Sequence, residues 1–257
     1  MLSVSAQISG ISGHSCLYYR IFNGLSSTEQ LLQYKAEIAG YLDAFARSLP
    51  KQIDAPAIAR VKLAGNAIWC RETLLWRFTE LAQDALEKLD QQRLATAMLL
   101  TRAVVETGAA LWYLDTKIKR AIETNDLTEL DEKLKQLVVG YKDPSAHADG
   151  VPKAINVLTF VGQVDKEIGG YASQYAALCE YSHPNHDGTA GLYSHPHKDT
   201  GLIDLGPNVR QSQSHETICA LNLSVAVMMF NHSYAAIGHA LDQLIDLCER
   251  ATPLRPD

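Results

Sequence analysis

The chain has 257 residues, a mass of 28.3 kDa and an apolar fraction of 47%. This length can bury one large core or two smaller ones, and the composition excludes an intrinsically disordered protein. With 23 basic and 29 acidic side chains the formal net charge is -6, which argues against a surface built mainly to neutralise a long stretch of nucleic-acid phosphate but leaves a local basic groove open. The five scattered cysteines contain no CxxC pair, so neither a disulfide framework nor a cysteine zinc site is indicated.

The sequence predicts a cytoplasmic protein that does not enter a membrane. No continuous apolar run approaches the roughly 18 residues that a bilayer-spanning helix needs. The N-terminus also lacks the basic and apolar stretches of a secretion signal. Residues 1–26 show no helical period, so we interpret them as an N-terminal arm before a single helical domain at 27–257.

Two helices are predicted at the start of this domain. The segment Ser27-Thr28-Glu29-Gln30 has the pattern of a capping box, in which serine and glutamine side chains bind free backbone N–H groups. The helix that it starts is stopped by Pro50, which cannot continue a helix. Asp54 is a suitable cap for a second helix with Pro56 in its first turn, running to about Leu89.

The following segments differ in how much of their surface is apolar. Trp69 and Trp76 share one face of the second helix, where we expect them to supply apolar contact area. Residues 94–114 are apolar on nearly every side, which predicts a central helix buried among its neighbours. Residues 127–138 alternate apolar and charged positions, as a surface helix does. Segment 143–154 contains the strongest loop signal and is a candidate break between subdomains.

The last part of the chain predicts three more helices and a hairpin. Residues 156–168 and 171–182 have helical patterns and are joined by two glycines. Residues 188–206 carry two short apolar runs between turn-forming residues, which indicates a small β-hairpin. Residues 211–250 form one long, mostly apolar helix. The predicted fold is therefore all-α, a multi-helix bundle with a small β-hairpin before a long C-terminal helix.

Four of the nine histidines lie between His183 and His197. His183 follows Glu180 by one helical turn, so both side chains can lie on one face of a helix end, with His186 and Asp187 in the turn that follows. Imidazoles and carboxylates bind zinc, iron, nickel or manganese. His183, His186 and Asp187 are therefore candidate ligands of a divalent metal. The alternative is a solvated turn, because the same residue types also form turns.

The predicted central helix carries charged residues among apolar ones. Arg102 and Glu106 lie one turn apart, and Tyr113 continues their stripe. A buried charge needs a partner, because removing one costs about 3 to 5 kcal/mol. Either an Arg–Glu bridge joins two helices, or the stripe faces a polar cavity in which Arg102 binds an anion and Glu106 is an acid, base or ligand. We expect Glu180 and His183 to complete that cavity, giving four candidate catalytic residues.

Two segments of the chain together resemble a known group of proteins. The first is Thr101-Arg102-Ala103-Val104-Val105-Glu106, and the second is Tyr175-Ala176-Ala177-Leu178-Cys179-Glu180-Tyr181-Ser182-His183-Pro184-Asn185, followed by Gly188-Thr189. Over roughly residues 65–250 the chain resembles uncharacterised bacterial helical proteins with a Tyr-x-x-Leu-Cys/Ser-Glu-x-x-His-Pro-Asn signature. More distantly it is similar to the HEPN superfamily. The resemblance implies a helical bundle that often dimerises and, in many members, cleaves RNA in toxin or phage-defence systems.

Within that superfamily the 2′-hydroxyl of RNA attacks its own phosphodiester. The resemblance implies that His183 is the general acid or base and that an arginine stabilises the developing charge, without a metal. The sequence departs from the family pattern, because Ala177 to Cys179 occupy the place where an arginine precedes the histidine. Either Arg102 supplies the cation from another helix, or RNA cleavage has been lost.

Three functions remain open from the sequence. The first is an HEPN-like, metal-independent ribonuclease of a toxin or phage-defence system, with RNA as a partner and a homodimer as the assembly. The second is a metal-dependent hydrolase that uses the His/Glu/Asp cluster. The third is a noncatalytic binding or oligomerisation protein. No nucleotide-binding motif is present, so a divalent metal is the one cofactor left open. Tyr113, Tyr181 and Asn185 are candidate ligand-binding residues.

Overall fold

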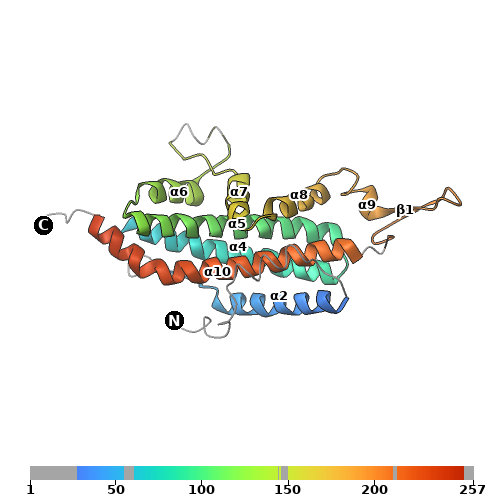
Figure 1. Ribbon diagram of the computed structural model, residues 1–257, viewed down its shortest axis with the longest axis horizontal. Helices are drawn as coiled ribbons and strands as arrows, with labels where there is room; N and C mark the ends of the chain where they lie inside the picture. The colour runs from blue at the N-terminus through green and yellow to red at the C-terminus, as the bar shows by residue number, and fades with distance from the viewer. Residues whose placement is uncertain (1–27, 55–60, 144, 146–149, 211–212, 252–257) are drawn as a thin grey trace.

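The computed structural model describes residues 28–54, 61–143, 145, 150–210 and 213–251. These residues form a bundle of helices with one two-stranded hairpin, which confirms the predicted all-α fold with a hairpin before a long last helix (Figure 1). The predicted N-terminal arm at 1–26 lies outside the described residues. In chain order the elements are α2 (Thr28–Ser48), α4 (Lys62–Asp90), α5 (Leu94–Thr124), α6 (Thr128–Val139), α7 (Val157–Glu167), α8 (Tyr171–Ser182), α9 (Ala190–Tyr193), β1 (Ser194–Pro196), β2 (Ile203–Leu205) and α10 (Gln213–Ala251).

Helix boundaries follow local chemistry. The central helix α5 extends beyond the predicted Leu114 to Thr124, where Asn125 adopts a left-handed conformation with φ 54° and ends it. Asparagine tolerates that conformation better than most residues, so it is a common helix terminator. Within the described residues α4 begins at Lys62. The predicted first turn of that helix, around Pro56, lies outside the described residues.

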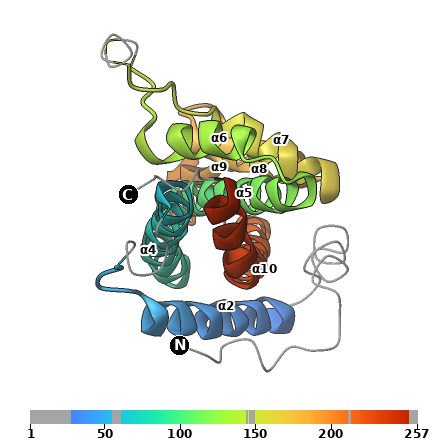
Figure 2. The same cartoon turned by 90° about the vertical axis from the view of Figure 1, so that its left-hand side faces the viewer.

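The helices form three layers (Figures 1 and 2). Helix α2 makes one outer layer, α4, α5 and α10 the middle one, and α6, α7 and α8 the other outer layer. Helix α5 packs against α4, α6, α7, α8 and α10, whereas α2 packs against α4 and α10. The predicted central position of α5 is therefore confirmed. Because α6 and α7 both pack on α5, the segment predicted as a subdomain break at 143–154 connects two helices of one layer.

Aromatic side chains from three helices make the centre of the main core. The rings of Phe78 of α4 and Phe230 of α10 stack with centroids 4.0 Å apart, and Phe45 of α2 meets Phe230 edge-on at 5.6 Å. Gly108 lets α5 approach α10 closely, because a Cβ there would lie 3.1 Å from the Met229 side chain. These contacts fix the three long helices side by side.

A smaller core cluster lies at one end of the bundle. Its buried members come from α2, α4, α5, α9 and α10: Leu31, Leu89, Leu94, Ala97, Met98, Leu192, Cys219 and Ala220. Leu192 is the contribution of α9, the short helix directly before the hairpin. This contact anchors the start of the hairpin to the bundle.

The two tryptophans of α4 do not belong to the core, contrary to the sequence prediction. Trp69 is 44% exposed and Trp76 is 46% exposed, and the Trp76 indole N–H donates to the Pro50 carbonyl oxygen at 2.8 Å. The seven-residue spacing does place both on one face, but α4 buries another face, which carries residues such as Ala67 and Leu75.

Two helices are long and apolar enough, by length and composition, to cross a membrane. They are α5 and α10, and 61% and 67% of their most apolar windows are buried inside the bundle. The apolar residues of these two helices do not form continuous runs, so the helices qualify only when hydropathy is averaged over an 18-residue window. Core helices of soluble proteins have the same composition, so the cytoplasmic, membrane-free location stays a prediction.

Candidate functional site

Arg102 and Glu106 of α5 form a polar cluster with Tyr175 of α8, which we call the Arg102 cluster. Arg102 Nε donates to Glu106 Oε1 at 3.1 Å, and Arg102 Nη2 donates to the Tyr175 hydroxyl at 3.3 Å. The Tyr175 hydroxyl donates to Glu106 Oε1 at 2.8 Å. The three side chains thus form a closed ring of polar contacts. The Arg–Glu bridge itself lies within α5 rather than between two helices, and Tyr175 is the residue that joins it to α8.

The Arg102 cluster is partly buried, and its surroundings set the charges of its members. The side chains of Arg102 and Glu106 are 30% and 26% exposed. Burial, helped by the hydrogen bond to Glu106, raises the pKa of Tyr175 to about 12. Burial alone would lower the pKa of Arg102, but the Tyr175 hydroxyl, Cys179 and Glu106 outweigh it and raise that pKa. At neutral pH Tyr175 is therefore a neutral donor and Arg102 a cation.

His183 lies beyond the Arg102 cluster, at the far end of α8. Helix α8 runs antiparallel to α5, because Tyr181 near its C-terminus packs on the smaller core cluster at the N-terminus of α5 (Figure 1). His183 follows Tyr175 by about two turns, or roughly 12 Å along the helix axis. Its side chain is exposed, and no described hydrogen bond or ion pair joins it to Arg102 or Glu106. The predicted four-residue cavity is therefore not held together by direct contacts.

The segment after α8 is a turn held by its own side chains. Asn185 Nδ2 donates to Glu180 Oε2, and Asn185 Oδ1 accepts the Gly188 N–H at 3.0 Å. A Cβ at Gly188 would collide with the His183 carbonyl oxygen, so the turn requires glycine. Glu180 and Asn185, predicted as catalytic and ligand-binding residues, thus contact each other rather than the Arg102 cluster. Tyr181, the other residue of this region predicted to bind a ligand, packs edge-on against the His215 ring at 5.3 Å.

The predicted metal site is not assembled. His186 Nδ1 lies 2.9 Å from Asp187 Oδ1, and this pair is exposed. Nowhere in the part of the chain that the structure describes do three His, Cys, Asp or Glu side chains gather in a way that could hold a metal ion. The physical reason is that α8 ends at Ser182, so His183, His186 and Asp187 do not share a helical face.

Tyr113 lies apart from the other candidates. It is 5% exposed, its ring packs 5.2 Å from that of Phe160 of α7, and Lys117 Nζ lies 5.1 Å from the ring centroid. It shares a stripe with Glu106, as predicted, but two helical turns separate them. Tyr113 therefore faces α7, whereas the Arg102 cluster faces α8.

Tyr175 was not among the site residues predicted from the sequence. The available signal was the one-turn spacing of Tyr171, Tyr175 and Cys179 on one stripe of α8. The Tyr171 hydroxyl donates to the Val105 carbonyl oxygen at 3.0 Å, so this stripe is the face that α8 turns toward α5. Reading that spacing as a contact face would have predicted Tyr175 beside Arg102.

The hairpin forms a second candidate site. Its predicted location at 188–206 is confirmed, but the apolar run Gly191 to Tyr193 belongs to α9 and the strands are Ser194–Pro196 and Ile203–Leu205. We call residues 194–205 the hairpin arm; it projects beyond the end of the helical layers (Figure 1). Three of its side chains are large, apolar and exposed: Leu202 at 66%, Ile203 at 59% and Leu205 at 78%. The arm therefore presents apolar surface away from the bundle.

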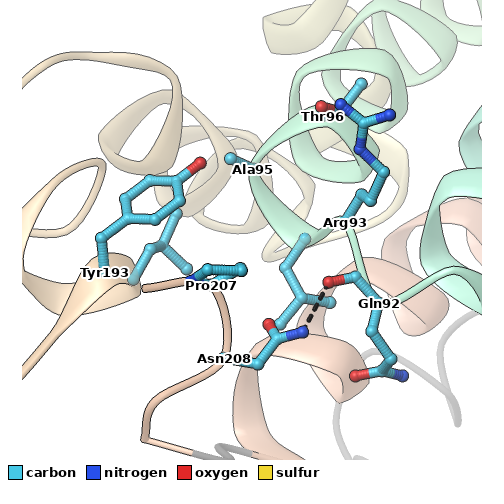
Figure 3. Close-up of a pocket in the computed structure, with 9 residues that line it drawn as sticks. Gln92, Arg93, Ala95, Thr96, Tyr193, Pro207 and Asn208 are labelled. Atoms are coloured by element: carbon cyan, nitrogen blue, oxygen red, sulfur yellow. Dashed lines mark hydrogen bonds between the residues drawn. The ribbon is translucent and has the colours of Figure 1, made fainter. Parts of the chain in front are cut away.

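A pocket of about 270 Å³ lies at the base of the hairpin arm (Figure 3). It separates the start of α5 from the two ends of the arm, and its lining residues are Gln92, Arg93, Leu94, Ala95, Thr96, Leu192, Tyr193, Pro207 and Asn208. The Asn208 side-chain amide donates to the Gln92 carbonyl oxygen at 2.7 Å across one edge of it. This hydrogen bond holds the base of the arm to the turn between α4 and α5.

No protein-family model, curated protein or solved structure matches this chain. The resemblance to HEPN proteins therefore stays a prediction from the sequence.

Proposed function

We propose that this is a noncatalytic binding or assembly protein and that the hairpin arm is its binding element. The observation that carries the proposal is the concentration of exposed apolar side chains on the arm. The described residues expose eleven large apolar side chains, and three of them, Leu202, Ile203 and Leu205, lie within four consecutive positions. Scattered exposed apolar residues are normal on a protein surface, whereas a cluster of them marks an interaction site.

The position of the hairpin arm supports the same proposal. An isolated two-stranded hairpin is at best marginally stable in water. The arm is fastened at its base by Leu192 in the smaller core cluster and by the Asn208–Gln92 hydrogen bond. A short strand pair that is fixed at its base and apolar along one strand gains stability when a partner covers it.

The closed geometry of the Arg102 cluster also favours binding over catalysis. Its cation and its carboxylate already bind each other and Tyr175. An anionic substrate would therefore compete with Glu106 for the guanidinium of Arg102. The described contacts give this cluster a role in joining α5 to α8.

Site-specific photo-cross-linking in the cells that express this protein tests the proposal. A benzoylphenylalanine placed at Leu205 should give a cross-linked product of defined mass. The same group at Leu158, which is 60% exposed on α7, is the matched control and should give none. Equal yields from both positions, or no product from Leu205, would contradict a binding role of the arm.

Metal-independent RNA cleavage is a second candidate function. One observation favours it: the exposed His183 side chain has no hydrogen bond or ion pair within the described residues, so it is available to a substrate as acid or base. The test is to incubate total RNA with wild type, His183→Ala and Arg102→Ala. Cleavage that is lost in both variants would support this function, and identical RNA profiles for all three proteins would contradict it.

A further inference from the structure

The backbone hydrogen bonds of the hairpin arm determine which groups face outward. The His197 N–H donates to the Leu202 carbonyl oxygen at 2.8 Å, and the Gly206 N–H donates to the Tyr193 carbonyl oxygen at 3.0 Å. In antiparallel strands, residues that bond across the pair alternate with residues whose N–H and C=O point to the outer edges. The bonds at both ends of the arm therefore fix the outward-facing residues between them.

The outer edge of β1 is closed. Its outward-facing residues are Ser194 and Pro196. Pro196 has no N–H to offer, and the Ser194 carbonyl oxygen already accepts a hydrogen bond from Arg210 Nε at 2.7 Å. Proline and covered backbone groups are usual means by which proteins protect an edge strand.

The outer edge of β2, in contrast, is open. Its outward-facing residues are Ile203 and Leu205, and no hydrogen bond to their outward N–H and C=O groups occurs among the described residues. Both side chains are apolar and exposed. An edge of this kind pairs readily with another strand.

We propose that the strand that pairs with β2 is the β2 strand of a second copy of this chain. This inference rests on the proposed binding role of the hairpin arm and names its partner. A two-fold axis through Asp204 places Ile203 of each copy opposite Leu205 of the partner subunit. Each such pair exchanges two backbone hydrogen bonds, so this register uses all the outward groups of both strands.

The same register brings the tip of each arm to the pocket of the other copy. Leu202 lies opposite Gly206 of the partner subunit, the residue before the pocket-lining Pro207. The 66% exposed Leu202 side chain then enters that pocket, which includes apolar atoms of Leu94 and Leu192. Three paired residues alone would bury far less than the roughly 1,000 Å² that a specific interface needs. The pocket contact, made twice by symmetry, supplies further buried area.

Charge repulsion between two aspartates weakens the pairing of the two β2 strands in this register, and this repulsion can be tested. Asp204 of each copy lies directly opposite Asp204 of the partner subunit, and like charges at such positions repel. His197 Nε2 lies 2.8 Å from Asp204 Oδ2, and the neighbouring imidazole is that of His195. Asp204→Asn should therefore lower the dimer dissociation constant by up to roughly fivefold.

Sedimentation over a wide range of protein concentration, with full-length protein, tests the inference. Wild type should dimerise. Ile203→Pro removes only the outward N–H group of each copy, so it should raise the dissociation constant roughly tenfold or more. The circular dichroism and the melting temperature should match wild type at concentrations at which both proteins are monomeric. Ala95→Trp should also weaken the dimer by filling the pocket. Leu32→Lys, at a 62% exposed position of α2, is the control and should have no effect.

Each result has a defined meaning. A wild-type protein that stays monomeric at every concentration, or an Ile203→Pro variant that dimerises like wild type, overturns the pairing of β2 strands. A dimer that Ala95→Trp does not weaken overturns the pocket contact. The mass of the Leu205 cross-link separates this inference from the proposed function: a product with another protein keeps the binding role and rejects the second copy, whereas no product rejects both.

Discussion

Replacement of Glu106 by alanine removes the carboxylate that both Arg102 and Tyr175 contact. Loss of one member of a fully buried ion pair costs about 3 to 5 kcal/mol. Here the Arg102 side chain is 30% exposed and keeps its bond to Tyr175, so water can solvate part of the orphaned charge. We expect Glu106→Ala to lower the free energy of unfolding by about 1 to 2 kcal/mol, and the melting temperature by roughly 3 to 6 °C.

Urea and thermal unfolding of four proteins measure this effect: wild type, Glu106→Ala, Tyr175→Phe and the double variant. Because the two side chains share a hydrogen bond, the double variant should lose less stability than the sum of the single ones. Glu106→Gln keeps an acceptor at the same place and should lose about half as much. An unchanged free energy of unfolding in Glu106→Ala, or strictly additive losses, would refute the conclusion that the Arg102 cluster joins α5 to α8.

Three further predictions concern other parts of the molecule. Burial raises the pKa of the Cys70 thiol to about 12. The stability that the buried neutral thiol contributes is therefore present below pH 9 and is lost as the pH rises toward 12. The free energy of unfolding measured in urea should fall over this pH range, and it should fall less steeply in Cys70→Ala. Gly188→Ala should lower the melting temperature, because its Cβ collides with the His183 carbonyl oxygen; a melting curve that matches wild type would show that the turn adapts. Asn208→Ala removes the hydrogen bond to the α4–α5 turn, so trypsin should cut at Lys198 faster than in wild type; equal cutting rates would mean that the base of the arm is held by other contacts.

Most of the fold could be predicted because the helices carry their own signals. Segment 94–114 is apolar on nearly every side, and a helix in the middle of the bundle can bury most of that surface. Glycine and proline mark the ends of several helices, as at Pro50 and at the glycines before α8. The direction of an amphipathic face is harder to predict. Trp69 and Trp76 share a face as expected, but only the packing of α4 shows that this face points to solvent.

The candidate site could be predicted only where its contacts are local. Arg102 and Glu106 lie one turn apart on one helix, so their pairing follows from spacing alone. Tyr175 joins them through the packing of α8 on α5, which the sequence does not specify. The first strand of the hairpin begins later than predicted, because the Leu192 and Tyr193 N–H groups bond back to the Thr189 carbonyl oxygen in a short helix. The open edge of β2 became visible only once the backbone hydrogen bonds were known.

Amide hydrogen exchange of the hairpin arm, followed by NMR at low and high protein concentration, tests the central claim most directly. The N–H groups of Ile203 and Leu205 face outward and have no acceptor within the described residues of one copy. If two arms pair, these two amides exchange markedly more slowly at high concentration, while the exposed amide of Lys198 in the tip keeps its rate. Exchange of Ile203 and Leu205 at the same fast rate at every concentration would contradict the pairing of two copies through β2.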